Sequence, residues 1–256
     1  MISPLASIHP DARIGENVEI GPFTTISADV EIGEGTWIGP NVTIMDGARI
    51  GTDCRIFSGA VLSAIPQDLK FQGESTTVEI GDRSTIRECV TINRGTKAYG
   101  KTVVGKDCLI MAYVHIAHDC IIGDHVILVN SVALAGHVEI GDYGIVSGLS
   151  AVHQFVKIGA HVMIGGGAMV RKDVPPFITA AGEPLAYAGV NSVGLKRRNF
   201  SQEDINEIQT LYRTLYQSGM NVSQAVNRIK EQHSNRPLAD LILSFIEQSD
   251  RGLIRK

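Results

Sequence analysis

Aromatic side chains are scarce in this sequence. Phe, Tyr and Trp make up 5% of the 256 residues, with a single Trp. The hydrophobic fraction is nevertheless 44%, so the interior of the fold must be filled mainly by aliphatic side chains. Glycine is abundant, with 27 residues. This combination is expected for a fold with a narrow aliphatic interior and tight corners.

The sequence also lacks a strong charge imbalance and long apolar runs. The formal net charge is −4, which argues against a nucleic-acid-binding protein. No apolar run approaches the length of a transmembrane helix. Residues 1–15 lack the basic and apolar regions of a secretory signal peptide. We therefore expect a cytoplasmic protein.

Cysteine is infrequent, with four residues. No pair of them has the spacing of metal ligands, and a reducing cytoplasm disfavours disulfides. We therefore expect free thiols. Three cysteines fall on a small inward position of the repeat described next and the fourth lies beside one: Cys54, Cys108 and Cys120, and then Cys89.

The dominant pattern is a period of six residues. From Ile8 onward every sixth position is aliphatic, in three blocks that keep one phase, and no polar residue falls on these anchor positions. The residue after the anchor is often Gly, and the fourth residue after the anchor is small or β-branched. The anchors are Ile8, Ile14, Ile20, Ile26, Ile32, Ile38, Ile44, Ile50, Ile56 and Leu62; Ile80, Ile86 and Ile92; and Val104, Ile110, Ile116, Ile122, Leu128, Leu134, Ile140, Val146, Val152, Ile158, Ile164 and Val170.

A short period with one aliphatic anchor predicts a left-handed parallel β-helix of hexapeptide repeats. Each hexad supplies a strand and a turn, and Gly after the anchor permits either a positive φ or a close backbone approach at the corner. Three hexads form a triangular coil of 18 residues, and stacked coils pair at about 4.8 Å. An antiparallel sandwich is disfavoured because it needs a period of two and hairpin turns.

Two segments interrupt the anchors without changing their phase. The first, near 63–79, has the length of one coil and carries Gln67, Asp68 and Lys70. The second, near 93–103, contains Gly95 and Gly100, which favour turns. A loop that leaves a solenoid often carries the function, but a polar loop is equally consistent with a solvated surface. Composition alone leaves both interpretations open.

The coil length predicts which residues lie together in the 104–170 block. Residues 18 apart should occupy the same corner of successive coils. His118 then stacks with Gly136, and Gly136 with Gln154. Asp119 stacks with His137 by the same count.

A third histidine follows from the same count. Ala117 and Ala135 stack with His153, so His118, His137 and His153 are predicted to share one corner on three successive coils. His115 lies one turn earlier on the coil of His118.

Regular coils are expected to end near Val170, because Pro175 and Pro176 cannot continue a ladder. A linker through Gly182 and Gly189 is expected next. Three helices should follow, opening at Ser201 with Asp204 and running to about Gln217, at Asn221 with Gln224, and at Pro237. We therefore divide the chain into an all-β parallel β-helix over 1–190 and a small C-terminal α-helical cap domain over 191–256.

The histidine corner fits acyl transfer. A neutral imidazole can remove a proton from an attacking hydroxyl, and the N–H of Gly136 could stabilise an oxyanion. Asp119 follows His118 directly. Because neighbouring strand residues point to opposite faces, we expect any orienting role of Asp119 to involve its backbone.

Two other interpretations account for less of the sequence. The corner could hold zinc, since trimeric β-helices such as γ-class carbonic anhydrases bind zinc through histidines from two subunits. Such an enzyme would not need the polar loop or the basic cluster Lys196, Arg197 and Arg198. A non-catalytic assembly module would leave both the histidines and this cluster unexplained. We therefore favour acyl transfer without a metal.

Several longer motifs resemble the acyl-[acyl-carrier-protein]–UDP-N-acetylglucosamine O-acyltransferase family. In chain order they are IGDRSTIRECVTINRGT, HIAHDC, LAGHV, AVHQF, IGAHVM, DVPPF, GVNSVGLKRR and RGLIR. The resemblance covers essentially the whole chain, including the QDLKFQGE loop and the helical tail.

The resemblance implies an activity and partners. The family transfers a 3-hydroxyacyl chain from acyl carrier protein to the glucosamine 3-hydroxyl of UDP-N-acetylglucosamine, the first step of lipid A biosynthesis. It implies a homotrimer with active sites between subunits, so the loop and the histidines need not come from one chain. No cofactor is implied beyond the 4′-phosphopantetheine that arrives on the carrier protein.

The resemblance also implies residue roles. His118 is expected to be the general base, with Asp119 paired to it. The Gly136 N–H is expected to be the oxyanion donor, with His137 nearby. Substrate contacts are expected from Gln67, Asp68, Lys70, His115, His153, Gln154, Asn191, Arg197 and Arg198. The basic cluster Lys196, Arg197 and Arg198, with Arg213, is expected to help dock an acidic carrier protein.

Met163 and Gly166 match the positions at which the family measures acyl length, and Gly166 leaves room for a long chain. Two positions depart from the family: Val193 stands where relatives carry an acid, and Asn93 replaces a common His. The N-acyltransferase of the same pathway shares the hexads but has an additional N-terminal domain. Since the anchors begin at Ile8, the O-acyltransferase is favoured.

Overall fold

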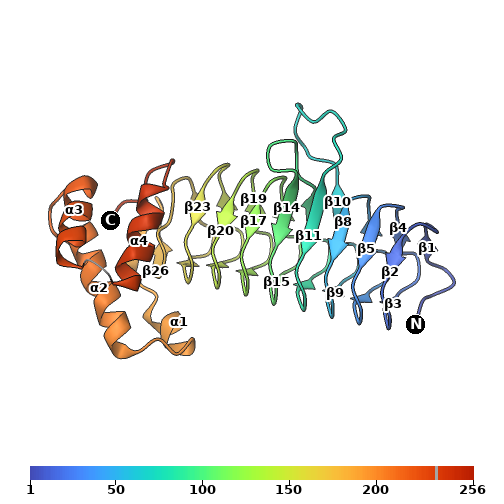
Figure 1. Cartoon of the computed structure of the whole chain (residues 1–256), viewed down its shortest axis with the longest axis horizontal. Helices are drawn as coiled ribbons and strands as arrows, with labels where there is room; N and C mark the ends of the chain where they lie inside the picture. The colour runs from blue at the N-terminus through green and yellow to red at the C-terminus, as the bar shows by residue number, and fades with distance from the viewer. Residues whose placement is uncertain (234–235) are drawn as a thin grey trace.

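The aliphatic anchors fill the interior of a long three-sided prism, with helices at its C-terminal end (Figure 1). This structure, a computed structural model, describes residues 1–233 and 236–256. Anchors from Ile20 to Val170 are at most 5% exposed. The predicted parallel β-helix is therefore confirmed, because every pairing between successive coils is parallel and joins anchor to anchor.

Each of the three sides of the prism is one sheet. The first face contains β1 (Ser7–Ile8), β4 (Thr25–Ile26), β7 (Thr43–Ile44), β10 (Val61–Ala64), β13 (Thr91–Asn93), β16 (His115–Ile116), β19 (Ala133–Leu134), β22 (Ala151–Val152) and β25 (Met169–Val170). The second face contains β2 (Arg13–Ile14), β5 (Val30–Ile32), β8 (Ala48–Ile50), β11 (Thr77–Ile80), β14 (Lys101–Val104), β17 (Ile121–Ile122), β20 (Glu139–Ile140) and β23 (Lys157–Ile158).

The third face extends the prism to its C-terminal end. It contains β3 (Glu19–Ile20), β6 (Trp37–Ile38), β9 (Arg55–Ile56), β12 (Thr85–Ile86), β15 (Leu109–Ile110), β18 (Ile127–Leu128), β21 (Ile145–Val146), β24 (Met163–Ile164), β26 (Ile178–Ala181) and β27 (Ala186–Val190). Only the last pair, β26 with β27, is antiparallel among the described strands.

At the corners, close backbone approach and positive φ occur at different positions, although both were expected at the glycine after the anchor. Glycines after the anchor provide close approach: a Cβ at Gly15 would lie 2.7 Å from the backbone N of Glu34, and one at Gly159 would lie 2.5 Å from that of Pro176. The positive φ instead falls three residues after the anchor, usually on a non-glycine residue such as Asp119 (φ 59°) or His137 (φ 61°). Side chains at this position form columns along each corner.

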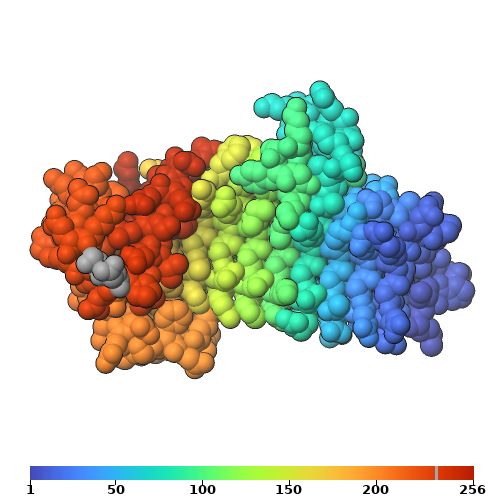
Figure 2. Space-filling model, viewed as in Figure 1, coloured from blue at the N-terminus to red at the C-terminus, as the bar shows by residue number. Residues whose placement is uncertain are grey.

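Both interruptions of the period are insertions within a coil. The first has the length of one coil, but Ile80 pairs with Ile50, thirty residues earlier, and not with Leu62. Val104 pairs with Ile80, twenty-four residues earlier. The loops 65–76 and 94–100 therefore leave the same corner, between the first and second faces, and project together (Figures 1 and 2). The sequence could not show this, because an insertion of whole hexads preserves the phase.

The prolines do not end the third face, contrary to the prediction. Val174 forms a bridge to Ile158, and β26 pairs with β24. Pro176 lies in the turn between these two pairings, where no ladder N–H is required. The expected linker contains β27. A short helix that was not predicted, α1 (Ser192–Arg197), follows it and is capped by the Asn191 side chain, which accepts from Gly194 N.

The three predicted helices are confirmed as α2 (Gln202–Gln217), α3 (Val222–Gln232) and α4 (Pro237–Glu247). Ser201 with Asp204 and Asn221 with Gln224 form the two expected capping boxes. The buried hydroxyl of Tyr212 donates to the Pro176 carbonyl at 2.6 Å and joins α2 to the prism. Among the described residues, no helix is long and apolar enough to cross a lipid bilayer.

A buried carboxylate and two isolated β-bridges hold the C-terminal tail against the prism. Asp173 is 1% exposed and accepts from Lys157 N, Ser249 Oγ and Arg251 N. All four cysteines are free thiols; Cys54, Cys108 and Cys120 are buried and Cys89 is exposed.

Candidate active site

His118 and Asp119 form a buried hydrogen-bonded pair at the corner between the first and second faces. Nδ1 of His118 lies 2.8 Å from Oδ2 of Asp119, and the residues are 7% and 0% exposed. The expectation that Asp119 would act through its backbone is wrong. Asp119 lies in a turn and has a positive φ. The alternation of side chains between the two faces of a strand therefore does not apply, and the side chains of His118 and Asp119 meet.

The second loop encloses the Asp119 carboxylate. Oδ1 accepts from the backbone N–H groups of Thr96 at 3.0 Å and Tyr99 at 3.2 Å, and Oδ2 accepts from Thr96 Oγ1 at 2.7 Å. Burial by itself would raise the pKa of Asp119, but the hydrogen bonds from Thr96 and His118 outweigh it, and the pKa lies below its ordinary value. The carboxylate therefore stays ionised. Sequence reasoning missed Thr96 and Tyr99, because the loop follows no period.

His137 occupies the next coil of the same corner, as the 18-residue count predicted. Its Nε2 lies 3.7 Å from Asp119 Oδ2, and its ring packs edge-on to His118 and stacks on Phe155. Burial lowers the pKa of His137, although the negative charge of Asp119 opposes the shift. Phe155 was not singled out, yet the same count from His137 would have found it.

Gly136 lies against the His118 ring. A Cβ at this position would be 2.7 Å from Nε2 of His118, so any side chain would displace the imidazole. The Gly136 N–H makes no hydrogen bond within the described part of the chain, which leaves it free to bind an oxyanion.

A groove of about 740 Å³ opens beside this pair. Its floor is the outward side of the first face, where Ala133 and Ala151 leave space above the strands. The predicted site residues that line it are Gln67, Asp68, Lys70, His115, His118, Gly136 and Gln154. The first loop, His115 and His118 of one chain thus line the same groove.

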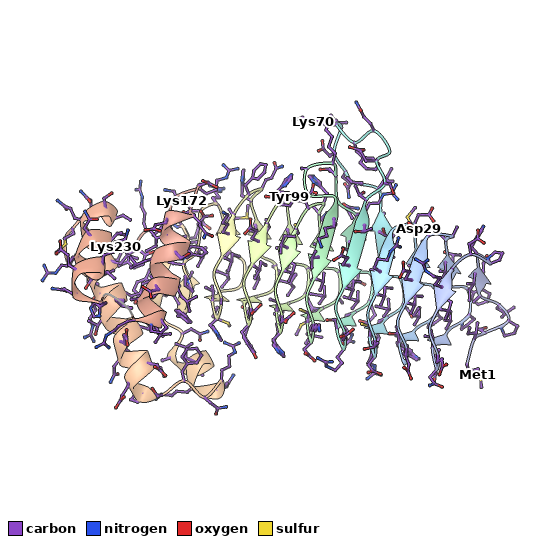
Figure 3. All side chains as sticks on the ribbon, in the orientation of Figure 1. Met1, Asp29, Lys70, Tyr99, Lys172 and Lys230 are labelled. Carbon is purple, nitrogen blue, oxygen red and sulfur yellow. The ribbon has the colours of Figure 1, made fainter. Side chains whose placement is uncertain are left out.

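The first loop is held over the groove by two residues at its base. Asn93 Nδ2 donates to the Ile65 carbonyl at 3.2 Å, and the Arg94 guanidinium lies over the Phe71 ring. Figure 3 shows Lys70 at the projecting end of this loop and Tyr99 on the second loop nearby. Asn93 therefore has a structural role here that the sequence did not reveal.

His115 lines the groove one turn before His118. Its Nδ1 lies 2.7 Å from Thr91 Oγ1, and burial lowers its pKa. His153 does not converge with the other histidines as predicted. Its ring is exposed and its Nδ1–H donates to the Gln154 carbonyl at 3.1 Å. His153 occupies the coil position of Ala117 and Ala135, one residue before that of His118, and its side chain takes a different direction.

Comparison with known proteins identifies the family. The profile described as "UDP N-acetylglucosamine O-acyltransferase, domain 2" matches residues 173–254, and the bacterial transferase hexapeptide profile matches 29–64 and 101–136. The acyl-[acyl-carrier-protein]–UDP-N-acetylglucosamine O-acyltransferase of Chlorobaculum parvum is 56% identical over 98% of this chain and 96% of its own. That of a Janthinobacterium species is 48% identical over 100% and 99%.

Solved structures agree with these relatives. The crystal structure of a UDP-N-acetylglucosamine acyltransferase from Bacteroides fragilis has a TM-score of 0.98 and 51% identity, with full coverage of both chains. That from Francisella novicida has a TM-score of 0.96 and 43% identity, covering 100% of this chain and 94% of its own. The chain belongs to the acyl-[acyl-carrier-protein]–UDP-N-acetylglucosamine O-acyltransferase family.

Other positions matched to this O-acyltransferase family lie away from the groove of the single chain. Asn191 is 8% exposed and donates from Nδ2 to the His161 carbonyl. Arg198 donates to the Tyr143 carbonyl at 3.1 Å and lies over the Tyr143 ring, so it faces inward and not outward with its basic neighbours. Val193, the departure from the O-acyltransferase pattern, is 62% exposed.

Met163 and Gly166 belong to the third face and the corner that follows it. A Cβ at Gly166 would be 3.5 Å from the nearest atom, the Gly148 carbonyl oxygen. Unlike Gly136, Gly166 therefore accepts a Cβ without displacing its neighbours.

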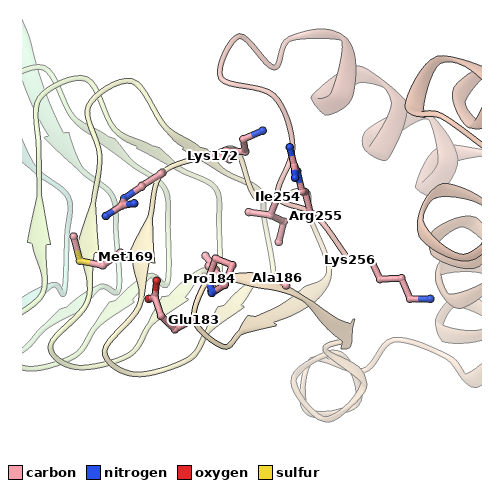
Figure 4. Close-up of a pocket in the computed structure, with 10 residues that line it drawn as sticks. Met169, Lys172, Glu183, Pro184, Ala186, Ile254, Arg255 and Lys256 are labelled. Carbon is pink, nitrogen blue, oxygen red and sulfur yellow. The ribbon is translucent and has the colours of Figure 1, made fainter.

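A second cavity, of about 340 Å³, lies at the end of the prism (Figure 4). Apolar and basic side chains and one acidic residue, Glu183, line it, and none of the predicted site residues does. Its lining is Met169, Arg171, Lys172, Glu183, Pro184, Leu185, Ala186, Ile254, Arg255 and Lys256.

Proposed function

We propose that this chain transfers a 3-hydroxyacyl group from acyl carrier protein to the glucosamine 3-hydroxyl of UDP-N-acetylglucosamine, the first step of lipid A biosynthesis. The observation that carries the proposal is the buried His118–Asp119 pair, which opens onto a groove beside the free N–H of Gly136. Membership of the O-acyltransferase family supplies the substrate class.

The geometry supports a direct transfer. The ionised Asp119 accepts from Nδ1–H of His118, which leaves Nε2 as the proton acceptor on the groove side. His118 Nε2 removes the proton from the sugar hydroxyl as the oxygen attacks the thioester carbonyl. The Gly136 N–H stabilises the resulting oxyanion. The C–S bond then breaks, and the departing thiolate takes the proton from His118.

The substrates are assigned to the charged edges of the groove. Asp68 and Lys70 are proposed to contact the sugar and the phosphates, with Gln67 beside them. His115, His153 and Gln154 are proposed to make further substrate contacts; His115 and Gln154 line the groove. His137 is proposed to support the negative charge of Asp119 from the next coil.

The nucleotide is assigned to the start of the helical region. Asn191 and Arg198 are proposed to contact it, and Arg197 to contact the donor or the phosphates. Nη1 of Arg198 is buried without a partner among the described residues, so this donor remains available to a ligand. Lys196 and Arg197 are in the last turn of α1 and are proposed to dock the acidic carrier protein with Arg213.

We further propose that the enzyme is a cytoplasmic homotrimer that needs no metal and no cofactor beyond the carrier's 4′-phosphopantetheine. The outward side of the third face carries an apolar stripe that a second copy would cover. The stripe is formed by the paired residues Leu109, Ile127, Ile145 and Met163.

A transfer assay with purified protein, UDP-N-acetylglucosamine and a panel of 3-hydroxyacyl carrier proteins tests the activity. Formation of the 3-O-acyl sugar nucleotide in the presence of a chelator is the expected result. No transfer from any donor, together with stoichiometric zinc in the purified protein, would instead favour a zinc enzyme at the same corner.

His118→Ala tests the general base. The substitution should reduce turnover by about 10²-fold or more while the protein stays folded and assembled. The measurement is turnover in the same assay, with assembly checked by sedimentation. Near-normal turnover in a correctly assembled variant would refute the assignment.

A further inference from the structure

His118, Asp119 and His137 are grouped closely enough to act together as the protein ligands of a zinc ion. They are the one group of three His, Cys, Asp or Glu residues found within the described residues whose possible ligand atoms all lie within 4.8 Å of one another. Asp119 is fully buried, and the two imidazoles are 9% and 10% exposed at their side chains. Because all three side chains are buried or nearly so, they are not a cluster of solvated surface groups.

The separations are close to those of a metal site. Asp119 Oδ2 lies 2.8 Å from His118 Nδ1 and 3.7 Å from His137 Nε2. Zinc binds imidazole nitrogen and carboxylate oxygen at about 2.0–2.2 Å in tetrahedral geometry, so two ligand atoms should be separated by roughly 3.4 Å. To accommodate the ion, the 2.8 Å separation would have to lengthen by about 0.6 Å and the 3.7 Å separation to shorten by about 0.3 Å.

The surroundings hold the three side chains in this orientation. Thr96 and Tyr99 fix the Asp119 carboxylate by hydrogen bonds. Phe155 stacks on the His137 ring, and Tyr99 packs edge-on to it. Such support of the ligands is typical of protein metal sites. Of the three ligand residues, His118 also lines the groove.

We propose that this corner binds one Zn²⁺ per chain through His118 Nδ1, Asp119 Oδ2 and His137 Nε2, and that the bound ion inhibits acyl transfer. The inhibition rests on the proposed function, whereas the binding does not. On binding, Zn²⁺ replaces the proton between His118 Nδ1 and Asp119. The neutral imidazole then carries its proton on Nε2, so the groove-facing nitrogen can no longer accept the proton of the sugar hydroxyl.

Binding is measured first, without any substrate. Chelator-treated full-length protein is titrated with Zn²⁺ by calorimetry and with Co²⁺ by visible absorption, because tetrahedral Co²⁺ has a distinctive spectrum. One ion per chain and a tetrahedral Co²⁺ spectrum are expected. Asp119→Asn and His137→Asn should each weaken binding at least tenfold, because each removes a ligand. Thermal unfolding of both variants reports whether they are folded.

His125→Asn is the matched control. His125 also lies at a corner, where it stacks on Tyr143 and has Asp107 at 4.0 Å, but it is on a different edge of the prism. This variant should keep the stoichiometry and the affinity of the unmodified protein. Saturating Zn²⁺ should reduce turnover at least tenfold in the unmodified protein and in His125→Asn, and excess chelator should restore it.

The outcomes separate the two proposals. Absence of binding in the unmodified protein, or binding that persists in folded Asp119→Asn and His137→Asn, overturns the zinc site. Binding without loss of turnover overturns the inhibition. Failure of the metal-free protein to transfer acyl groups, when the separate Co²⁺ titration still shows binding at this corner, overturns only the proposed function.

Discussion

At the scale of single residues, Thr96 is the side chain that most directly holds the proposed catalytic pair. Its hydroxyl donates to Asp119 Oδ2, the same atom that accepts from His118. Thr96→Val removes this bond while keeping the shape of the side chain. Turnover should fall about tenfold, because a hydrogen bond to a charged group contributes roughly 1.5–3 kcal/mol, and KM should change little.

The positioning role of Thr96 has two controls. Thr96→Ser keeps a hydroxyl and should restore most of the turnover. Thr36→Val removes a buried hydroxyl that donates to the Gly51 carbonyl, far from the groove; it should lower the melting temperature without lowering turnover. If Thr96→Val and Thr36→Val have the same effects, Thr96 has only a structural role.

Gly166 gives a second prediction at the same scale. Because a Cβ is tolerated there without a close contact, Gly166→Met should fold normally and its side chain should occupy space proposed for the acyl chain. We expect preference to shift toward shorter 3-hydroxyacyl donors, measured as relative turnover across the donor panel. Gly166→Ala should give a smaller shift in the same direction, and an unchanged profile in both variants would contradict the proposed role.

At the scale of elements, the corner between the second and third faces joins the prism to α1. The His161 ring stacks between Tyr143 and Phe177 and packs edge-on to Phe200, beyond α1. Burial, assisted by the positive charge of Arg198, lowers the pKa of His161 to about 4. This junction therefore contains a histidine that remains neutral in the folded chain at mildly acidic pH.

The lowered pKa predicts acid sensitivity. Below about pH 6.5 the unfolded chain binds a proton that folded His161 does not take until about pH 4, so stability present at neutral pH is lost across this window. The loss is below about 1.4 kcal/mol per pH unit, because solvent reaches part of the ring. His161→Phe should show a smaller fall in melting temperature between neutral pH and about pH 5.

His9→Phe is the control for this pH effect. The His9 side chain is 47% exposed, so its replacement should leave the acid sensitivity unchanged. Equal falls in melting temperature for the unmodified protein and His161→Phe would show that His161 does not contribute to it.

At the scale of the whole molecule, the apolar stripe on the third face predicts the assembly. Ile127 is central in this stripe, between Leu109 and Ile145. Ile127→Lys would place a charge in the proposed contact between subunits, where an unpaired charge is strongly unfavourable. We expect monomers and loss of transfer, measured by sedimentation and by the transfer assay.

Glu139→Lys changes the charge on the second face and should leave the trimer intact, because Glu139 pairs with Lys157 outside the stripe. If Ile127→Lys also sediments as a trimer, the third face is not the contact between subunits.

The period of six is sufficient to predict much of this architecture. Anchor positions define the interior because each coil must bury one aliphatic residue per face, and the coil length alone places Asp119 next to His137, as the fold confirms. The capping boxes at Ser201 and Asn221 are equally visible in the sequence, since they depend on residues three apart.

The position of an inserted loop and the direction of a side chain cannot be read from the sequence in the same way. The loop 65–76 preserves the phase of the anchors, so its place within a coil becomes clear only from the pairing of Ile80 with Ile50. The exposed direction of the His153 ring and the inward turn of Arg198 likewise depend on hydrogen bonds, to the Gln154 and Tyr143 carbonyls, that the period does not specify.

The sequence by itself determined the prism, the corner at which the histidines lie and the family, because each follows from local spacing and motif order. Only the tertiary structure decided that Asp119 meets His118 through its side chain and that Thr96 and Tyr99 enclose it. The physical reason is that a positive φ at the corner redirects the carboxylate, and a loop inserted one coil earlier supplies donors that no repeat encodes.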